Sequence, residues 1–427
     1  MVSGEYYIAL GITKLDADYE KVESLDTEKN SAYLHERVHF IQNFSTLYGV
    51  TRAAYYLRQY LGMIHKVKEG EFPISSFLPY DGNEEDFYNA IFSCSAGDSF
   101  SEDGQCIECH KIQKISEEDA YIDYYKDDFP KSRDDFKKQV ILEFDDDKRY
   151  EFGGSALSES MAYLFEEYFF DSHDYSHVFP YNVCELLYQY IIGENCKKNT
   201  VLIALCYASM MSLFPGNTFI ELLYELKEKK DKIQSMEDVF KLSDSKMLPV
   251  NKNIINELCM YIDRIFPVET ENPIKIFEEE SKYIRDWIKE RYRYIAGHET
   301  EFREALIWIM EVCKKEKRIS ALAKLLDEYG HPLFVDKNGK LYSMNDEKMV
   351  HILAPFSLWG LLMERKGKCS LYQICKGNDQ NTDVKCDSEC WKHMCKDKKC
   401  LFKYYLYKMG LGDVQFENLK NSPFKKK

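Results

Sequence analysis

The chain has 427 residues, of which 45% are apolar and 15% aromatic, so it can bury the cores of two or three domains, and wholesale disorder is excluded. Its formal net charge of -15 repels polyphosphate and disfavours a nucleic acid as partner, although the stretch 392–427 is rich in Lys. The longest apolar run, 201–214, is shorter than the ~20 residues that cross a bilayer and predicts a buried helix.

The first predicted elements are a strand and a helix. Residues 6–12 are apolar and aromatic and predict one short buried strand. Asp26 or Ser31 could cap a helix that runs to about Tyr48, where Gly49 would end it. This helix carries the most informative motif of the chain.

The middle of the chain is expected to be polar first and then helical. A second helix is predicted over 51–61. Residues 66–150 are dominated by Gly, Asp, Ser and Glu, and we expect an insert with limited structure of its own, or a lid. A helix is predicted again from Ser155 to Phe170. Residues 183–330 are expected to be almost wholly helical, with breaks at Gly193, Pro215, Pro249, Pro267 and Gly297.

The last part of the chain is expected to contain a β-hairpin and a Cys-rich unit. Asn338-Gly339 lies between two strand-like segments and is a dipeptide that tight hairpin turns prefer. We therefore expect a hairpin and a helix over 331–365, and a separate unit that binds metal over 366–427.

The predicted first helix contains the sequence His35-Glu36-Arg37-Val38-His39, an HExxH motif. Residues four apart on a helix lie one above the other, about 6 Å apart along the axis, so two imidazoles can reach one zinc ion. The Glu beside the first His then points toward the fourth coordination position, where it can take a proton from water. We predict His35 and His39 as zinc ligands and Glu36 as general base.

The residues around the motif follow the same helical spacing. Leu34, Val38 and Ile41 recur at positions that would face the core. Gln42 continues the stripe of the two His residues and could hold a ligand or a substrate carbonyl.

A catalytic zinc site needs a third protein ligand. Glu159 lies early in a predicted helix whose neighbouring residues are mostly apolar or small. A carboxylate in that setting costs free energy unless it is paired or bound to metal. Ala162, three residues later, would leave room for the facing metal helix. We predict Glu159 as the third ligand, with Glu166 and Glu167 as alternatives.

An HExxH helix followed downstream by a helix with a Glu near small residues resembles the gluzincin branch of zinc metallopeptidases. The resemblance covers the segments 31–48 and 153–170, and it implies peptide-bond hydrolysis with the ligands and the general base named above. A metzincin would carry a third His where this chain has Ser45, so that branch is excluded.

Hydrolysis also needs a group that stabilises the oxyanion. Tyr163 is the predicted catalytic residue for this role. Other candidates follow the Glu159 helix: His173, Tyr175, His177 and Tyr181.

Fourteen Cys residues in a chain whose start shows no export signal predict thiols or metal ligands rather than disulfides. Six of them, with His393 among them, lie close together near the C-terminus. They predict a structural zinc site, and an iron–sulfur cluster is less favoured because no spacing matches a ferredoxin. The six are Cys369, Cys375, Cys386, Cys390, Cys395 and Cys400. A smaller zinc clip could form from Cys94, Cys106, Cys109 and His110.

The predicted fold class is mainly α (α+β). It combines a zincin-like catalytic region with a small sheet over 1–182, a helical domain over 183–330 and the two C-terminal units. The predicted function is that of a cytoplasmic zinc metallopeptidase with a protein or peptide substrate and no membrane partner. The alternative is a non-catalytic, metal-stabilised module that binds a protein or a nucleic acid. A third reading is redox sensing through a C-terminal iron–sulfur cluster.

Overall fold

A computed structural model gives the fold, and all structural statements below refer to the residues that it describes. These are 4–16, 27–73, 95–98, 107–108, 111–118, 139–144, 148–170, 178–196, 198–229, 233–266, 275–314, 318, 320–322, 324–325, 333–336, 341–342, 353–362, 365, 369–372, 389–390 and 400–424.

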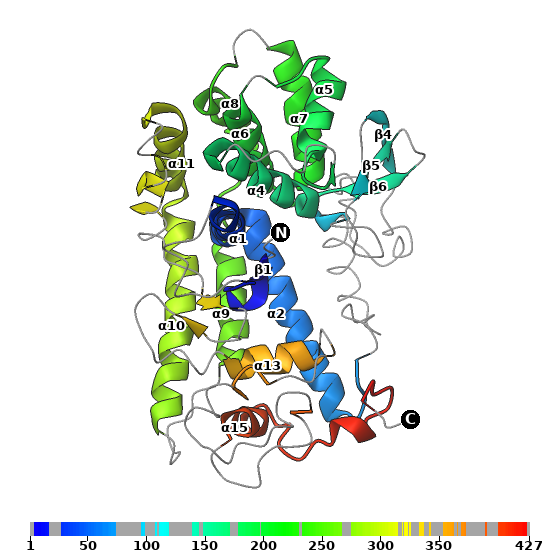
Figure 1. The fold of residues 1–427 in the computed structure, drawn as a ribbon, viewed down its shortest axis with the longest axis vertical. Helices are drawn as coiled ribbons and strands as arrows, with labels where there is room; N and C mark the ends of the chain where they lie inside the picture. The colour runs from blue at the N-terminus through cyan, green and yellow to red at the C-terminus, as the bar shows by residue number, and fades with distance from the viewer. Residues whose placement is uncertain are drawn as a thin grey trace.

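The protein is mostly helical, as its sequence predicts, and also contains small sheets (Figure 1). The helices are α1 (Thr27–Ser45), α2 (Leu47–Lys68), α4 (Gly154–Phe170), α5 (Val183–Ile192), α6 (Asn199–Met210), α7 (Pro215–Glu228), α8 (Met236–Ser243), α9 (Lys252–Ile265), α10 (Lys275–Gly297), α11 (Glu299–Ile307), α13 (Leu353–Leu362) and α15 (Leu401–Lys408), with the π-helix η6 (Trp308–Val312) and the 3-10 helices η1 (Ile8–Leu10) and η9 (Phe416–Asn418). The strands are β1 (Gly4–Tyr7), β2 (Ile12–Leu15), β3 (Ile107–Glu108), β4 (Ile112–Glu118), β5 (Gln139–Phe144), β6 (Arg149–Phe152), β7 (Val178–Phe179), β8 (Leu333–Val335) and β9 (Leu341–Tyr342).

The prediction of one strand over 6–12 is wrong, because this segment turns back on itself. β1 ends at Tyr7, and β2 returns antiparallel to it from Ile12. The turn is possible because Gly11 adopts a left-handed conformation with φ of 61°. β1 therefore becomes the edge strand of a sheet with the order β1-β2-β8-β9.

The predicted hairpin strands are confirmed, and their place in the fold is new information. β8 and β9 pair antiparallel on either side of the expected turn, which itself lies outside the described residues. β8 also pairs in parallel with β2, so that Ile12 lies opposite Leu333. The hairpin thus completes the sheet that the N-terminal strands begin. The division of the chain into four units stays a prediction.

The first two helices meet at a different residue from the one predicted. α1 ends at Ser45, and Thr46 caps α2 by accepting a hydrogen bond from the Gly49 backbone N–H (3.0 Å). Gly49 is therefore inside α2. A Cβ there would lie 2.1 Å from the Gln42 carbonyl oxygen, so glycine permits the close contact between the two helices. α2 is also longer than the predicted 51–61.

The insert over 66–150 has more regular structure than expected. β4, β5 and β6 form an antiparallel three-stranded sheet whose central strand is largely buried. The polar and charged residues that make up most of β4 concealed this sheet in the sequence, because this exposed strand resembles a polar loop. The sheet leads directly into α4.

The helical breaks predicted for the middle of the chain are confirmed where they can be seen. Gly193 ends α5 in a left-handed conformation, Pro215 is the first residue of α7, and α10 ends at Gly297. Pro249 lies between α8 and α9, whereas Pro267 is outside the described residues. The apolar run forms α6, which is buried on all sides, as predicted.

α1 lies in the middle of the molecule and is seen nearly end-on in Figure 1. It packs against α4, α2, α10 and β1. Every residue from Leu34 to Ser45 is buried, so α1 does not have the exposed polar face of a surface helix. Its polar side chains must therefore find partners inside the protein, since an unpaired buried polar group is costly.

Candidate metal centre

The HExxH motif lies on α1 with both imidazoles on the same side of the helix. His35 and His39 are one turn apart, and their ring centroids are 4.7 Å apart at an interplanar angle of 80°. The two side chains are only 11% and 10% exposed. The spacing expected from the sequence is thus realised inside the protein rather than on its surface.

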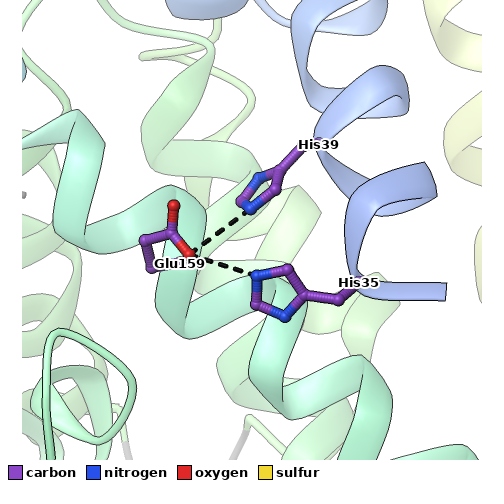
Figure 2. A group of neighbouring side chains, drawn as sticks. All are labelled: His35, His39 and Glu159. Atoms are coloured by element: carbon purple, nitrogen blue, oxygen red, sulfur yellow. Dashed lines mark hydrogen bonds and ion pairs between the residues drawn. The ribbon is translucent and has the colours of Figure 1, made fainter. Parts of the chain in front are cut away.

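Glu159 of α4 meets both imidazoles (Figure 2). Its Oε2 atom is 3.1 Å from Nε2 of His35 and 3.4 Å from Nε2 of His39. Among the described residues, these three form the one group of possible metal ligands whose atoms all lie within 4.8 Å of one another. Zinc–nitrogen and zinc–oxygen bonds of about 2.0–2.2 Å at tetrahedral angles would separate the ligand atoms by about 3.3 Å. Both distances from Oε2 of Glu159 agree with this separation, so the group is compatible with one zinc ion.

Small side chains let α4 come close to α1. Ser158 places its Oγ 3.1 Å from Nδ1 of His39, and Ala162, next to Glu159 on the helix, is fully buried. At the start of α4, a Cβ on Gly154 would lie 2.4 Å from the Tyr48 ring of α2. Small residues along α4 thus let this helix pack closely against α1 and α2, as the sequence predicts for Ala162.

Each imidazole is oriented by a second residue through its other ring nitrogen. The Nδ1–H of His35 donates to Glu166, a carboxylate that also accepts from the Ser31 hydroxyl. Nδ1 of His39 is 2.9 Å from Oε1 of Gln42. The Gln42 amide is itself fixed, because its Nε2 donates to the Ser158 carbonyl (3.0 Å). With both Nδ1 atoms engaged, both Nε2 atoms face Glu159, which is the arrangement that metal-binding imidazoles require.

Glu166 is thus an orienting partner of a ligand, whereas the sequence left it as an alternative ligand. Glu167, the other alternative, lies elsewhere and accepts hydrogen bonds from Tyr163 (3.0 Å) and Asn199 (3.1 Å). Gln42 acts on His39, in line with the expectation that it could hold a ligand.

Replacing Glu166 by Gln is expected to weaken zinc binding about 10- to 100-fold, the usual effect of losing a ligand's hydrogen-bonded carboxylate. The neutral amide can still accept from His35 but no longer raises its basicity. Competition with a chromophoric chelator measures the affinity. Glu167→Gln, one residue along α4, is the matched control and should leave it unchanged. Equal affinities in both variants and the wild type would contradict the orienting role.

The electrostatics of the cluster favour a shared proton between His35 and its two carboxylates. Burial disfavours the charged imidazole, but hydrogen bonds to Glu159 and Glu166 outweigh it and raise the pKa of His35 well above its usual value. Burial opposes the charge of Glu159, but the neighbouring His39 and the hydrogen bond from His35 lower its pKa well below the usual range. A divalent cation can replace this proton, since ligands bind metal in their deprotonated forms.

Glu36 lies beside the ligands without belonging to them. Burial is the main cause that raises the pKa of its carboxyl. The backbone of β1 passes directly over it, because a Cβ on Gly4 would lie 2.5 Å from its Oε1. Glu36 borders the same cavity as the three ligands, as the sequence predicts for the general base.

A cavity of about 260 Å³ opens onto the three ligands. Its walls come from β1 and η1, from α1, from the first two turns of α2, from α4 and from Tyr181. This volume is slightly below the range of about 300–1,000 Å³ that is usual for ligand pockets. The cavity can therefore accept a short piece of a substrate next to the ligands.

The predicted catalytic residue Tyr163 does not border this cavity. Its ring is buried, and its hydroxyl donates to Glu167. Tyr181 does border the cavity, with its ring centroid 6.0 Å from that of His35. Three other candidates for the oxyanion role lie outside the described residues: His173, Tyr175 and His177.

Three of the six C-terminal cysteines lie in the described part of the chain. Burial raises the pKa of Cys369 well above its usual value, and the neighbouring Cys390 and Cys400 raise it further. Cys369 is 3.9 Å from Oγ of Ser357 on α13, and Cys400 caps α15 by accepting from the Lys403 N–H (3.4 Å). The three sulfur atoms do not all lie within 4.8 Å of one another. The remaining candidates lie outside the described residues: Cys375, Cys386, Cys395, His393, Cys94, Cys106, Cys109 and His110.

Of the residues of the cavity wall that were missed in the sequence, Asn43 carried a signal and Arg52 did not. Asn43 is one turn beyond His39 on the same stripe of α1, so helical spacing could have identified it. Arg52 comes from α2, and no spacing in the sequence relates it to the motif. Both border the cavity.

Comparison of the chain with protein-family models, with curated proteins and with solved structures finds no match. Within the described residues, no helix combines the length and the apolar content that a membrane span requires. The functional argument therefore rests on the geometry of the site.

Proposed function

We propose that the protein is a zinc-dependent peptidase with Glu36 as its general base. The observation that carries the proposal is the spacing of three atoms. Oε2 of Glu159 lies 3.1 Å from Nε2 of His35 and 3.4 Å from Nε2 of His39, and both distances are close to the edge of a zinc tetrahedron. Three protein ligands would leave the fourth position open, which distinguishes catalytic from structural zinc sites.

The side chains around this position have the properties that hydrolysis needs. Bound zinc would supply a Lewis acid that polarises a carbonyl and makes water more acidic. The Glu36 carboxylate takes the proton of the attacking water and passes it to the leaving amine. Burial raises the pKa of this carboxyl, which brings it closer to the value at which a group both accepts and returns a proton.

We assign the stabilisation of the oxyanion to Tyr181 in place of Tyr163. Tyr181 borders the cavity, whereas the Tyr163 hydroxyl donates to Glu167. A phenol that donates a hydrogen bond to the carbonyl oxygen as it gains charge lowers the barrier to attack.

The substrate class follows from the motif and from the polar lining of the cavity. An HExxH helix with a downstream Glu resembles gluzincin peptidases, and the polar residues Gln42, Asn43 and Ser158 contribute to the cavity wall. A protein or peptide is therefore the proposed substrate, hydrolysed at a peptide bond.

Removal of the metal tests the proposal. A chelator is expected to abolish cleavage of a peptide library, read by mass spectrometry, and zinc is expected to restore it. The full-length chain should be used, because the ligands come from α1 and α4. Zinc bound at the His35 site without cleavage of any peptide would favour the non-catalytic alternative instead.

We also propose a second, structural zinc at the C-terminal cysteines. Its support is the density of cysteines near the C-terminus, together with the effect of Cys390 and Cys400, which both raise the pKa of Cys369. The zinc content of the purified protein should then be two ions per chain, and the solution should be colourless. Visible absorbance from sulfur-to-iron bands would favour an iron–sulfur cluster.

A further inference from the structure

Arg52 is the one cation among the residues that border the metal cavity, apart from the imidazoles. It lies in the second turn of α2 between two tyrosines. The guanidinium carbon is 5.9 Å from the Tyr48 ring centroid and 5.8 Å from the Tyr56 ring centroid. These rings hold a positive charge in place by cation–π interaction without neutralising it.

No carboxylate among the described residues forms an ion pair with Arg52, and its buried Nε–H has no hydrogen-bond acceptor. Arg37 and Arg291 also have a buried Nε atom of this kind, but neither borders the metal cavity.

The guanidinium nevertheless stays charged. Burial disfavours its charge, but Tyr48, Tyr56 and the Glu159 carboxylate outweigh this and raise the pKa of Arg52 above its usual value. A partly buried cation without a counter-ion carries an unrecovered desolvation cost. An anionic group of a ligand in the cavity would recover it.

A second residue of the wall has an unused hydrogen-bonding group. Nδ2 of Asn43 lies within hydrogen-bonding distance of the Ile8 carbonyl (3.3 Å) and of the hydroxyls of Tyr6 (3.1 Å) and Tyr292 (3.0 Å). Because the Ile8 carbonyl can only accept a hydrogen bond, the Asn43 atom that faces it must be the nitrogen Nδ2 and not the oxygen Oδ1. Oδ1 is then buried without any donor.

We propose that Arg52 binds a carboxylate of the substrate close to the bond that is cleaved, and that the enzyme thereby selects peptides that carry this charge. The planar fork of a guanidinium matches a carboxylate with two parallel hydrogen bonds. The cavity of about 260 Å³ is small enough that the metal ligands and Arg52 contact the same short piece of substrate. The inference rests on the proposed peptidase function.

Two sources can supply the carboxylate, namely the C-terminus of a peptide or an Asp or Glu side chain. Two pairs of N-acetylated peptides separate them. One pair has a free or an amidated C-terminus and no acidic side chain. The other pair is amidated and carries Glu or Gln next to the scissile bond. The wild type should prefer the charged member of at least one pair, and the identity of that pair reveals the source.

Arg52→Met is expected to lower kcat/KM for the charged member about 10- to 100-fold, the value of a charge-assisted hydrogen bond. The uncharged member should change less than threefold. Arg52→Lys keeps the charge but lacks the fork, and should recover part of the preference. Arg58→Met, on the same helix but away from the cavity, is the control and should match the wild type.

A binding measurement separates this inference from the proposed function. The zinc-loaded Glu36→Gln protein should bind the charged peptide more tightly than its uncharged partner in calorimetry, and Arg52→Met should remove the difference. If the wild type cleaves both members of both pairs equally, the peptidase function stands and the role of Arg52 fails. If Arg52→Met weakens all peptides equally, Arg52 has only a structural role.

Discussion

Replacing Glu36 by Gln is expected to lower the turnover number for peptide cleavage about 10²- to 10⁴-fold, the contribution of a positioned general base. The amide has the shape of the carboxylate but cannot accept the proton of water. The zinc content should stay unchanged, because the three ligand atoms belong to His35, His39 and Glu159. Turnover of the best peptide from the library and metal analysis of the same sample provide the two measurements.

Glu117→Gln is a suitable control for the loss of one carboxylate, because Glu117 is exposed on β4. It should retain full turnover. Loss of zinc together with activity in Glu36→Gln would show that Glu36 holds the metal, and unchanged turnover would contradict its role as the base. A thermal melt of both variants checks that the buried substitution leaves the fold intact.

The second large effect is expected for Glu159→Ala. This change removes the carboxylate that lies 3.1 Å from Nε2 of His35 and 3.4 Å from Nε2 of His39. Loss of a direct ligand should weaken zinc binding by more than the ~10- to 100-fold effect of an orienting residue, and cleavage should be lost with the metal. Equilibrium competition with a chelator measures the affinity.

Glu159→Ala should also change how the zinc affinity depends on pH. In the wild type, Glu159 and Glu166 raise the pKa of His35, so zinc must displace a proton there. Below that raised pKa, the zinc affinity should increase with pH by about tenfold per unit for one displaced proton. In Glu159→Ala one of the two groups that raise the pKa of His35 is gone, so the zinc affinity should stop increasing with pH at a lower pH than in the wild type. Zinc binding that does not depend on pH in either protein would contradict the shared proton.

Glu167→Ala is the control on the same helix. Glu167 accepts from Tyr163 and Asn199 away from the cavity, so its loss should lower the stability of the fold and leave the zinc affinity unchanged. If Glu159→Ala retains the wild-type affinity, the three-ligand site is wrong and with it the peptidase proposal.

The local part of the site could be predicted because it follows from helix geometry. Two His residues four positions apart must share a face once the segment is helical, and Gln42 must lie on the same stripe. Glu159 was predicted as the third ligand for an energetic reason, since a carboxylate among small, apolar neighbours needs a partner. Both expectations agree with the arrangement of α1 and α4.

The wrong predictions share a different cause. Strand pairing and helix packing decided where these strands and helices begin and end. The strand expected over 6–12 became a hairpin because Gly11 could turn the chain and β8 supplied a partner for β2. The junction after α1 moved to Thr46, whose side chain caps α2, while Gly49 was needed for close helix packing. The insert formed a sheet whose polar strand resembled a loop in the sequence.

The sequence by itself determined which side chains α1 presents and that a carboxylate on a second helix was available to complete the set. Only the tertiary structure decided that Glu159, 124 positions from His35, reaches both imidazoles, that Glu166 orients one of them, and that Tyr181 and Arg52 border the cavity. The physical reason is the range of the interactions. Helical spacing fixes neighbours within a few residues, whereas contacts between distant segments depend on how whole helices pack and on which small residues let them approach.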